Sequence, residues 1–572
     1  MNIKELTMKD KKNNSIIDLI LLLIYLICAL YFMAELYLGS LLSFRFMLLL
    51  GIGLLLILIL LFLSISKNAK SLLRRLITIL LCLLLLALSI VQMGIRTAFY
   101  ELDNVPKTTY HLSLIVSDED VMDIKDIKGG EIGLLADQAN SNTFALNELK
   151  KAKASFTYVE YIDYSKLILD LMNGRLDGIL VNDALYQKMC DLYTDVAANT
   201  HTIKDFNHVV KINFNQRDKD LNSEPFTVFV SGMDQNGDVS LAAKTDVNML
   251  LMVDPSRHHV EIISLLRDTY VPNPAYDYYP DKLTHTSYNG IDNTVESIES
   301  VFGFPIDYYV RVNFSTLINI VDTLDGIDVD VALSFCEQDS NRSFDTPICV
   351  DEGWQRLNGE EALAYARHRT SYSDVERTKA QQHIVEALAQ RLFSTDSIPK
   401  ISDVLKTASE NILMNVDMAS VKAFMRNEID TPRMWTFNAV SLTAGTTAML
   451  PCISWDSSWP LSVYLLSDTD LSMVYSKYLE MFDVLDFSLF NFNLNNELSE
   501  EIMPPYNSYL ITAENVNYKL DEVFALLPAD PIEIYETLEP GTVEENEQSV
   551  FDPMAQIQTS KLARAREESN SE

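Results

Sequence analysis

Residues 361–382, EALAYARHRTSYSDVERTKAQQ, are the stretch around which the rest of the chain is arranged. They place Arg367, Arg369 and Arg377 within eleven residues of one another, in a chain of 572 residues with a formal net charge of −35. The planar fork of arginine donates paired hydrogen bonds to phosphate or carboxylate oxygens. The stretch therefore predicts an anion site, although a solvated basic helix paired with nearby carboxylates explains the same composition.

The spacing within this stretch predicts two helices with a break between them. Arg367 and Arg369 would point about 200° apart on one continuous helix, so the first helix is expected to end or bend near them. Ser373 has a glutamate three residues later, the spacing of a capping box that starts a second helix. That helix carries Arg377 and Gln381 on one face, beside its positive dipole end.

Three apolar runs precede the rest of the chain, at Leu19–Leu38, Phe46–Ile65 and Leu76–Gly94. Each is near the roughly 20 residues that a helix needs to cross a bilayer. Lysines and arginines gather before the first run and between the second and third. The positive-inside rule therefore predicts a multi-pass protein of the cell membrane, with residues 1–15 cytoplasmic, spans within 16–96 and the remainder outside the cell.

The expected exterior, residues 101–572, carries a net charge of −41. A surface of this charge repels nucleic acid, so the composition argues against a nucleic-acid partner. Any anion site on this part of the chain must depend on a few cationic residues that lie close together. Cys336 and Cys349 lie thirteen residues apart in this part, where a disulfide is chemically permitted. An unpaired state is equally compatible with that spacing, and no Cys/His spacing resembles a zinc site.

The exported part has the pattern of two α/β units. In residues 97–224, short apolar strands alternate with amphipathic helices, which predicts a smaller accessory α/β domain with a polar linker or edge strand near its end. Residues 225–490 predict a larger α/β/α layered domain, with helices on both faces of a sheet. Residues 491–572 are expected to form an extension whose acidic tail is disordered.

Two carboxylates and one arginine follow strands of the larger domain. Asp234 ends a buried strand, and Asp246 directly precedes the strand at 247–253. A turn then leads to the strand at 259–265, which ends near Arg267. If these two strands are antiparallel neighbours, Asp246 and Arg267 meet at one edge of the sheet. A simple salt bridge would account for that meeting equally well.

Five motifs of this domain resemble, in order, the catalytic domain of the LytR-CpsA-Psr family. The three spans and the accessory domain ahead of it are similar to the capsule-assembly (CpsA-like) branch. The chain departs from the usual motifs at Leu265-Leu266, where isoleucine-proline is common, and at Ala380, where a second arginine is common. The motifs are TDVNMLLMVDP, SLLRDTYVP, DKLTHTSYNG, GWQRLNGEEALAYARHR and DVERTKAQQ.

The resemblance implies an extracellular phosphotransferase of a Gram-positive-type envelope. Such an enzyme moves a glycopolymer, a capsular polysaccharide or teichoic-acid-like chain, from an undecaprenyl-pyrophosphate-type carrier to peptidoglycan through a phosphodiester. A non-catalytic, membrane-tethered sensor or scaffold that binds lipid phosphate and regulates envelope biosynthesis is the alternative. The resemblance implies that a Mg²⁺ ion is bound by Asp234 and Asp246. It implies that the catalytic residues are Asp246, Arg267 and Arg369. The residues expected to hold the phosphate head group of the lipid are Arg267, Lys282, Arg367, Arg369, Arg377 and Gln381.

Overall fold

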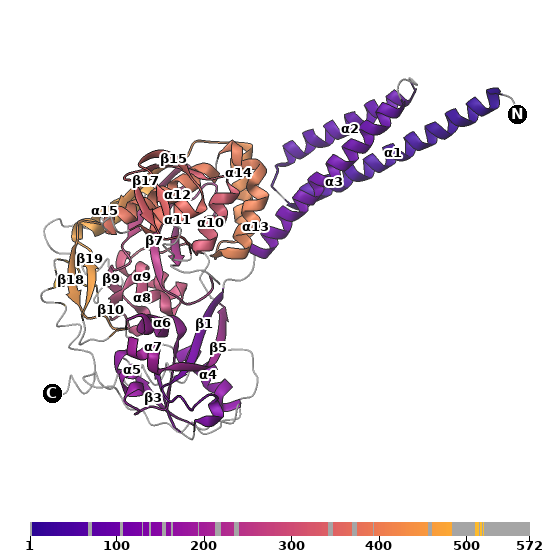
Figure 1. Cartoon of the computed structure of the whole chain (residues 1–572). Coiled ribbons are helices and arrows are strands. Elements are labelled where there is room, and N and C mark those ends of the chain that lie inside the picture. Colours follow the sequence, from indigo (N-terminus) through magenta and orange to yellow (C-terminus); the bar gives the residue numbers. More distant parts are fainter. Residues whose placement is uncertain are drawn as a thin grey trace.

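The computed structural model shows a folded body from which three long helices project (Figure 1). It describes residues 3–519 apart from 40, 67–70, 103–106, 128–129, 136–138, 152–155, 162–163, 193, 212–218, 234–238, 341–346, 369–373, 393, 456–459, 483–509, 514 and 517–518. The disordered tail that the sequence predicts lies outside these residues.

The three N-terminal helices are α1 (Ile3–Gly39), α2 (Phe44–Ser66) and α3 (Ser71–Leu102). Within them, Ile16–Gly39, Phe44–Ile65 and Leu72–Tyr100 are long and apolar enough to cross a membrane. Asp18 of α1 forms an ion pair with Arg75 of α3 at 2.6 Å. This pair and a second one between Asp18 and Arg74 hold α1 against α3 at their polar ends.

The third helix continues beyond its apolar run and packs on the folded body. Phe99 is completely buried in a cluster with Leu41 and Met418, and Lys422 lies 4.8 Å from the centre of its ring. Met418 and Lys422 belong to α14 (Met418–Asp430), which flanks α3 together with α13 (Ile401–Asn411). Side-chain packing therefore joins the three N-terminal helices to the body, and Figure 1 shows α13 and α14 beside the end of α3.

The first unit after the anchor, here called the lobe, is a five-stranded sheet in the order β3-β2-β4-β1-β5. Its last strand, β5, pairs antiparallel with β1, so the polar segment predicted as a linker or edge forms an edge strand. The strands are β1 (Lys107–Val116), β2 (Glu131–Leu135), β3 (Thr157–Tyr161), β4 (Gly178–Asn182) and β5 (His201–Lys211). The helices are η1 (Ile124–Asp126), α4 (Ala139–Lys151), α5 (Tyr164–Met172), α6 (Asp183–Leu192) and α7 (Thr194–Asn199).

The second unit is built on a six-stranded sheet in the order β16-β11-β6-β7-β8-β17. The turn after β7 makes β7 and β8 antiparallel neighbours, as the sequence predicts. These strands are β6 (Phe226–Met233), β7 (Thr245–Asp254), β8 (His259–Leu265), β11 (Tyr308–Val312), β16 (Leu413–Met414) and β17 (Thr436–Ser441).

Helices cover both faces of this sheet, which confirms the layered α/β/α architecture. Alternate residues of β7 face opposite sides: Leu250 packs with α9 (Ile291–Phe302) and α15 (Asp468–Met481), and Leu251 packs towards α12 (Asp374–Leu392) and α14. A strand buried on both faces reads as a nearly continuous apolar run, as NMLLMV does here.

Smaller elements complete the second unit. They are β9 (Tyr270–Pro272), η3 (Pro274–Tyr276), β10 (Pro280–Lys282), α8 (Leu283–Thr286), η4 (Ser287–Asn289), α10 (Phe314–Thr323), β12 (Ile327–Val331), β13 (Phe335–Glu337), β14 (Ile348–Val350), β15 (Gly353–Leu357), α11 (Gly359–Arg367), η5 (Thr395–Lys400), β18 (Thr446–Leu450) and β19 (Leu461–Leu465). Cys336 of β13 and Cys349 of β14 form a disulfide.

The lobe and the second unit share a hydrophobic core. Tyr164 and Leu167 of α5 belong to the same buried cluster as Tyr288 of η4 and Leu465 of β19. Ile511 also lies in this cluster, so the packed core reaches beyond residue 490, where the sequence pattern predicts that the second domain ends. Packing of this kind holds the lobe in one place relative to the loops around Tyr288.

Candidate functional site

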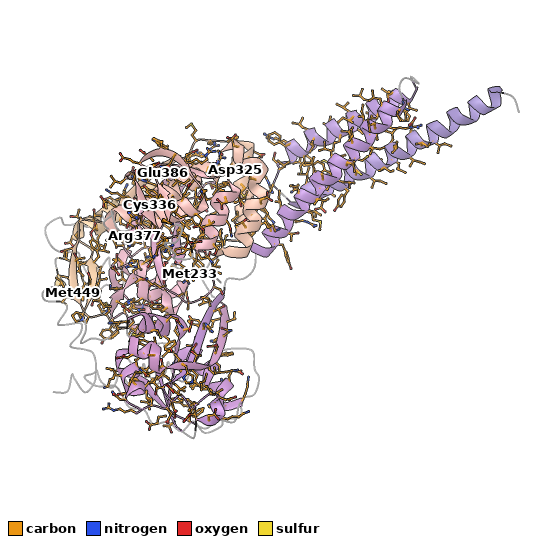
Figure 2. All side chains as sticks on the ribbon, viewed as in Figure 1. Met233, Asp325, Cys336, Arg377, Glu386 and Met449 are labelled. Carbon is orange, nitrogen blue, oxygen red and sulfur yellow. A yellow bond between two sulfur atoms is a disulfide. The ribbon has the colours of Figure 1, made fainter. Side chains whose placement is uncertain are left out.

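A cavity of about 720 Å³ lies between the sheet of the second unit and its helices α10, α11 and α12. It collects five of the residues that the sequence assigns to one site. Figure 2 labels two side chains of the lining, Met233 from β6 and Arg377 from α12. The polar and charged part of the lining comprises Lys244, Asp246, Arg267, Asn313, Glu337, Gln338, Arg367, Arg377 and Gln381.

Asp246 and Arg267 meet at one edge of the sheet, because β7 and β8 run antiparallel beside each other. Nη1 of Arg267 donates to both carboxylate oxygens of Asp246, at 3.0 and 3.1 Å. Nζ of Lys244 lies 3.3 Å from the same carboxylate. The salt bridge that the sequence left open is therefore present, and it forms part of the cavity wall rather than of an exposed surface.

The first helix of the arginine stretch ends where the spacing predicts. Helix α11 starts at a capping box in which the Asn358 side chain accepts the Glu361 N–H, and it ends at Arg367. Nη1 of Arg367 donates to the Asp339 carbonyl oxygen at 3.2 Å, and the guanidinium lies 4.9 Å from the centre of the Phe314 ring. The helix end thus directs a cation to the cavity.

The second helix of the stretch supplies the adjoining wall. Arg377 and Gln381, one turn apart on α12, are buried and both line the cavity. Nε2 of Gln381 donates to the Ala366 carbonyl oxygen of α11 at 3.2 Å. This bond ties α12 to α11 near Arg367, so residues from both helices reach the same space.

Of the three remaining predicted residues, the structure describes Lys282, which does not line the cavity. Nζ of Lys282 donates to Asp268 at 3.0 Å, and Asp268 lies 3.6 Å from Nε of Arg267. Lys282 is therefore linked to Arg267 of the cavity wall through the Asp268 carboxylate. Asp234 and Arg369 lie outside the described residues, as does Ser373, the expected cap of α12.

The remainder of the cavity is apolar. Helix α12 contributes Ile384, Val385, Leu388, Ala389 and Leu392 to it. With a rise of 1.5 Å per residue, the helix carries the wall about 22 Å from Arg377 to Leu392. Leu317 of α10 adds to the apolar side, whereas Val321 from the same helix packs into a neighbouring core. One helix therefore joins a cationic end to a long hydrocarbon-lined end.

Two charged residues of the lining were missed by the sequence analysis. Lys244 stands two residues before Asp246, so the period of a strand could have placed it on the same face. Glu337 gives no such signal, because only the fold of the disulfide-linked hairpin brings it to α11. There Nδ1 of His368 lies 3.1 Å from the Glu337 carboxylate.

The carboxylate oxygens of the cavity wall are suitable ligands for a hard cation. Asp246 lines the cavity with oxygen donors of the kind that Mg²⁺ prefers. Among the described residues, the cluster of His, Cys and carboxylate groups close enough for a shared ion is Asp281, His285 and Cys452. That cluster is buried, and hydrogen bonds already hold its carboxylate: Asp281 accepts from His285, inside the cluster, at 2.7 Å and from Asn273 at 3.1 Å.

Comparison with known proteins identifies relatives of this site-bearing unit. Residues 184–438 match the model of the LytR_cpsA_psr family. Polyisoprenyl-teichoic acid–peptidoglycan teichoic acid transferase TagT of Bacillus subtilis (strain 168) is 32% identical over 203 residues, covering 35% of this chain and 62% of TagT. The corresponding transferase TagV of the same organism is 31% identical over 229 residues, covering 39% of this chain and 58% of TagV.

Solved structures give the same neighbours. The crystal structure of B. subtilis TagV is 28% identical in sequence and covers 46% of this chain and 99% of that chain, with a TM-score of 0.39. The chain spans about three fifths of the length of the curated relatives named above. The family match, residues 184–438, covers most of the second unit and the last elements of the lobe, and the three-helix anchor lies outside it.

Proposed function

We propose that this chain, whose residues 184–438 match the LytR_cpsA_psr family model, is a member of that family and a membrane-anchored extracellular phosphotransferase. It attaches a glycopolymer, a capsular polysaccharide or teichoic-acid-like chain, from a polyprenyl-pyrophosphate carrier to peptidoglycan through a phosphodiester. The observation that carries this proposal is the cavity, which has arginines at one end and apolar side chains along the rest. The similarity to TagT and TagV, which are named polyisoprenyl-teichoic acid–peptidoglycan teichoic acid transferases, supports the same substrate class.

The cationic end fits a diphosphate. Phosphoryl transfer depends mainly on positioning and on neutralising charge on the transferred and leaving phosphates. Arg267, Arg367 and Arg377 line one space, and Arg267 can exchange part of its contact with Asp246 for phosphate oxygens. Each charge-assisted hydrogen bond of this kind stabilises a complex by about 1.5–3 kcal/mol. Arg369 and Lys282 are proposed as further contacts to the same head group.

The apolar end fits a polyprenyl chain. Burying one CH₂ group contributes about 0.8 kcal/mol, so even a few isoprene units held along α12 would bind the carrier firmly. A free sugar nucleotide would leave these apolar walls exposed to water. The shape of the lining thus favours a lipid-linked donor over a soluble one.

A Mg²⁺ ion is proposed as the cofactor, held by Asp246 together with Asp234. When bound, it would supply positive charge next to the diphosphate. Arg267 and Lys244 already surround Asp246 and would keep its carboxylate oriented towards the cavity.

The proposed orientation places the cavity outside the cell. The lysines and arginines that flank α1 and connect α2 to α3 predict a cytoplasmic N-terminus. The body follows α3 directly, so it lies on the opposite side of the membrane from that terminus. A lipid carrier facing outward would then present its head group at the level of the body.

The test uses the full chain in detergent with Mg²⁺, a polyprenyl-diphosphate-linked disaccharide as donor and peptidoglycan fragments as acceptor. We expect wild type to release polyprenyl phosphate and to form a sugar–peptidoglycan phosphodiester, both measured by mass spectrometry. Arg367→Ala should lower the release rate at least 100-fold. The matched control is Arg356→Ala, which removes an exposed arginine of β15 paired with Asp328 and should leave the rate within two-fold.

The scaffold alternative gives a different result in the same assay. A non-catalytic protein would bind the donor but release no polyprenyl phosphate with any acceptor. Such an outcome for wild type would exclude the transferase.

Binding of the prenyl chain in the apolar end of the cavity is tested with a substitution in that end and with donors of two lipid lengths. Ala389→Phe would fill part of the lining, so we expect KM to rise about ten-fold for a long polyprenyl donor and to change little for a short one. An equal rise for both donors would show that the prenyl chain does not occupy this end of the cavity.

A further inference from the structure

The hairpin that carries the disulfide brings a second carboxylate, Glu337, into the cavity. Resting on the proposed function, we propose that Glu337 is the residue that accepts the proton of the acceptor hydroxyl during transfer. Its carboxylate reaches the cavity from β13, and no motif of the arginine stretch includes it.

Glu337 is one of two carboxylates that the described part of the cavity wall contains, and the two differ in their partners. Asp246 receives two hydrogen bonds from Arg267 and lies beside Lys244. These contacts are all with cations, on the wall where the diphosphate and the proposed Mg²⁺ are expected. Glu337 has a histidine and a backbone N–H as its neighbours instead. Glu337 is therefore better placed than Asp246 to take a proton.

The hydrogen bonds of Glu337 leave capacity for a substrate. One carboxylate oxygen lies 3.1 Å from Nδ1 of His368, and the other accepts the Gln338 N–H at 3.0 Å. Each oxygen of an ionised carboxylate can accept about two hydrogen bonds, so both retain a free position. The side chain is 14% exposed and lines the cavity, which gives an acceptor hydroxyl a route to it.

The surroundings hold this carboxylate in place. His368 is buried, and its ring stacks on Phe335 with 4.5 Å between ring centres. The disulfide at Cys336 closes the hairpin one residue from Glu337. A base that must face a substrate repeatedly needs such fixed support, because proton transfer depends on hydrogen-bond geometry.

The same hairpin also contacts the arginine stretch. The carbonyl oxygen of Asp339 accepts a hydrogen bond from Arg367, and N–H of Ser340 donates to the Glu360 carboxylate at 3.0 Å. Glu337 and Arg367 are thus positioned by neighbouring residues of one segment. The distance between the proposed base, Glu337, and the phosphate-binding cation, Arg367, is therefore fixed by this segment.

The acceptor hydroxyl gives its proton to the Glu337 carboxylate while its oxygen forms a bond to the phosphorus next to the polymer. The bond from that phosphorus to the bridging oxygen breaks, and polyprenyl phosphate leaves with the electron pair. Glu337 then returns the proton to water. No oxidant, reductant or further co-reactant is required.

The test compares Glu337→Gln with wild type in the full-chain assay described above. Glutamine has nearly the same shape and can still accept a hydrogen bond from His368, but it cannot take the proton. We expect kcat to fall 100-fold or more, with the Kd for the donor unchanged within three-fold, since general-base catalysis typically contributes about 10²–10⁴. The matched control is Glu360→Gln, which alters a carboxylate that holds the same hairpin without lining the cavity; its kcat should stay within three-fold.

A pH profile separates proton transfer from support of the fold. Among the described residues, the charged or titratable groups that face the cavity or Glu337 are Lys244, Asp246, Arg267, Arg367, His368 and Arg377. All of them remain in the Glu337→Gln variant, so loss of the acidic limb of the kcat profile in that variant alone would identify Glu337. Glu337→Asp retains a carboxylate, so its kcat should be at least ten-fold higher than that of Glu337→Gln.

Two results would overturn the inference while leaving the proposed function intact. One is a wild-type enzyme that transfers polymer and a Glu337→Gln variant with less than a ten-fold loss in kcat. The other is a loss carried by KM or by the Kd for the donor, which would make Glu337 a binding or structural residue. Absence of transfer by wild type itself would instead reject the proposed function.

Discussion

The lobe and the second unit each contain an aspartate–arginine pair, and the two pairs have different surroundings. In the lobe, Arg175 contacts Asp170 at 2.9 Å, but the arginine side chain is 70% exposed. In the second unit, Arg267 contacts Asp246 at 3.0 Å with the arginine 18% exposed and facing a cavity. Water screens the first pair, whereas the second lies where charge interactions are stronger. The same pair of residue types therefore lines a cavity in one α/β sheet and forms a surface contact in the other.

The largest expected effect comes from exchanging these arginines for alanine. Arg267→Ala should lower the release of polyprenyl phosphate by about 10³-fold or more. The substitution removes a guanidinium that donates hydrogen bonds to phosphate, and it leaves the Asp246 carboxylate beside the diphosphate without its partner. Arg175→Ala should stay within two-fold of wild type. Kinetics with the lipid-linked donor measures both, and equal losses would show that the two pairs do not differ in function.

The shared core predicts that the lobe and the second unit unfold together. Tyr164→Ala removes a completely buried ring that packs in the cluster containing Tyr288, and it should lower the free energy of unfolding by about 3–5 kcal/mol. Urea unfolding should show one transition for both units. Two separate transitions in wild type would contradict this coupling.

Tyr164→Phe is the matched control for that experiment. Among the described residues, the buried Tyr164 hydroxyl has no hydrogen-bond partner. Removing it while keeping the ring should leave stability unchanged or slightly increased, because an unsatisfied buried hydroxyl is costly.

The disulfide should matter for the second unit more than for the lobe. Replacing Cys336 and Cys349 by serine opens a link between positions thirteen residues apart and should cost about 3 kcal/mol of stability. It should also lower kcat, because Glu337 and Asp339 lie beside the link. Cys190→Ser, which changes a cysteine of the lobe that is not disulfide-bonded, should leave both quantities nearly unchanged.

The smallest effect concerns acid stability of the loops between the two units. Burial by itself raises the pKa of Asp281, but the charge of His285 and hydrogen bonds outweigh it and lower this pKa below its usual value. A lowered folded-state pKa contributes stability above about pH 4, which is lost as the pH falls further. Urea unfolding from pH 7 to pH 3 should show this loss in wild type and a flatter profile in Asp281→Asn. A variant profile as steep as that of wild type would contradict the assignment.

The residues of the arginine stretch were predictable because their spacing is local. The two-residue separation of Arg367 and Arg369 requires a helix break, and α11 ends at Arg367. The meeting of Asp246 with Arg267 was also predictable, since a short turn between two strands leaves them antiparallel neighbours. The assignment of these residues to phosphate remains a prediction until the assays above are done.

Other features have no local signal. Glu337 reaches the cavity because a hairpin folds back on α11, and the contact with His368 spans thirty-one residues of sequence. The shared core of the lobe and the second unit joins residues as distant as Tyr164 and Ile511. Patterns of period 2 or 3.6 describe which face of an element is apolar, but not which distant element covers that face.

The sequence by itself determined the three apolar helices, the two α/β units and the concentration of arginines, because these depend on composition and on spacing within one element. The tertiary structure alone decided that the arginines share a cavity with Lys244 and Glu337, and that the cavity continues into an apolar wall along α12. Long-range packing sets those relations: a side chain meets partners that the folded chain brings near, whatever their distance in sequence.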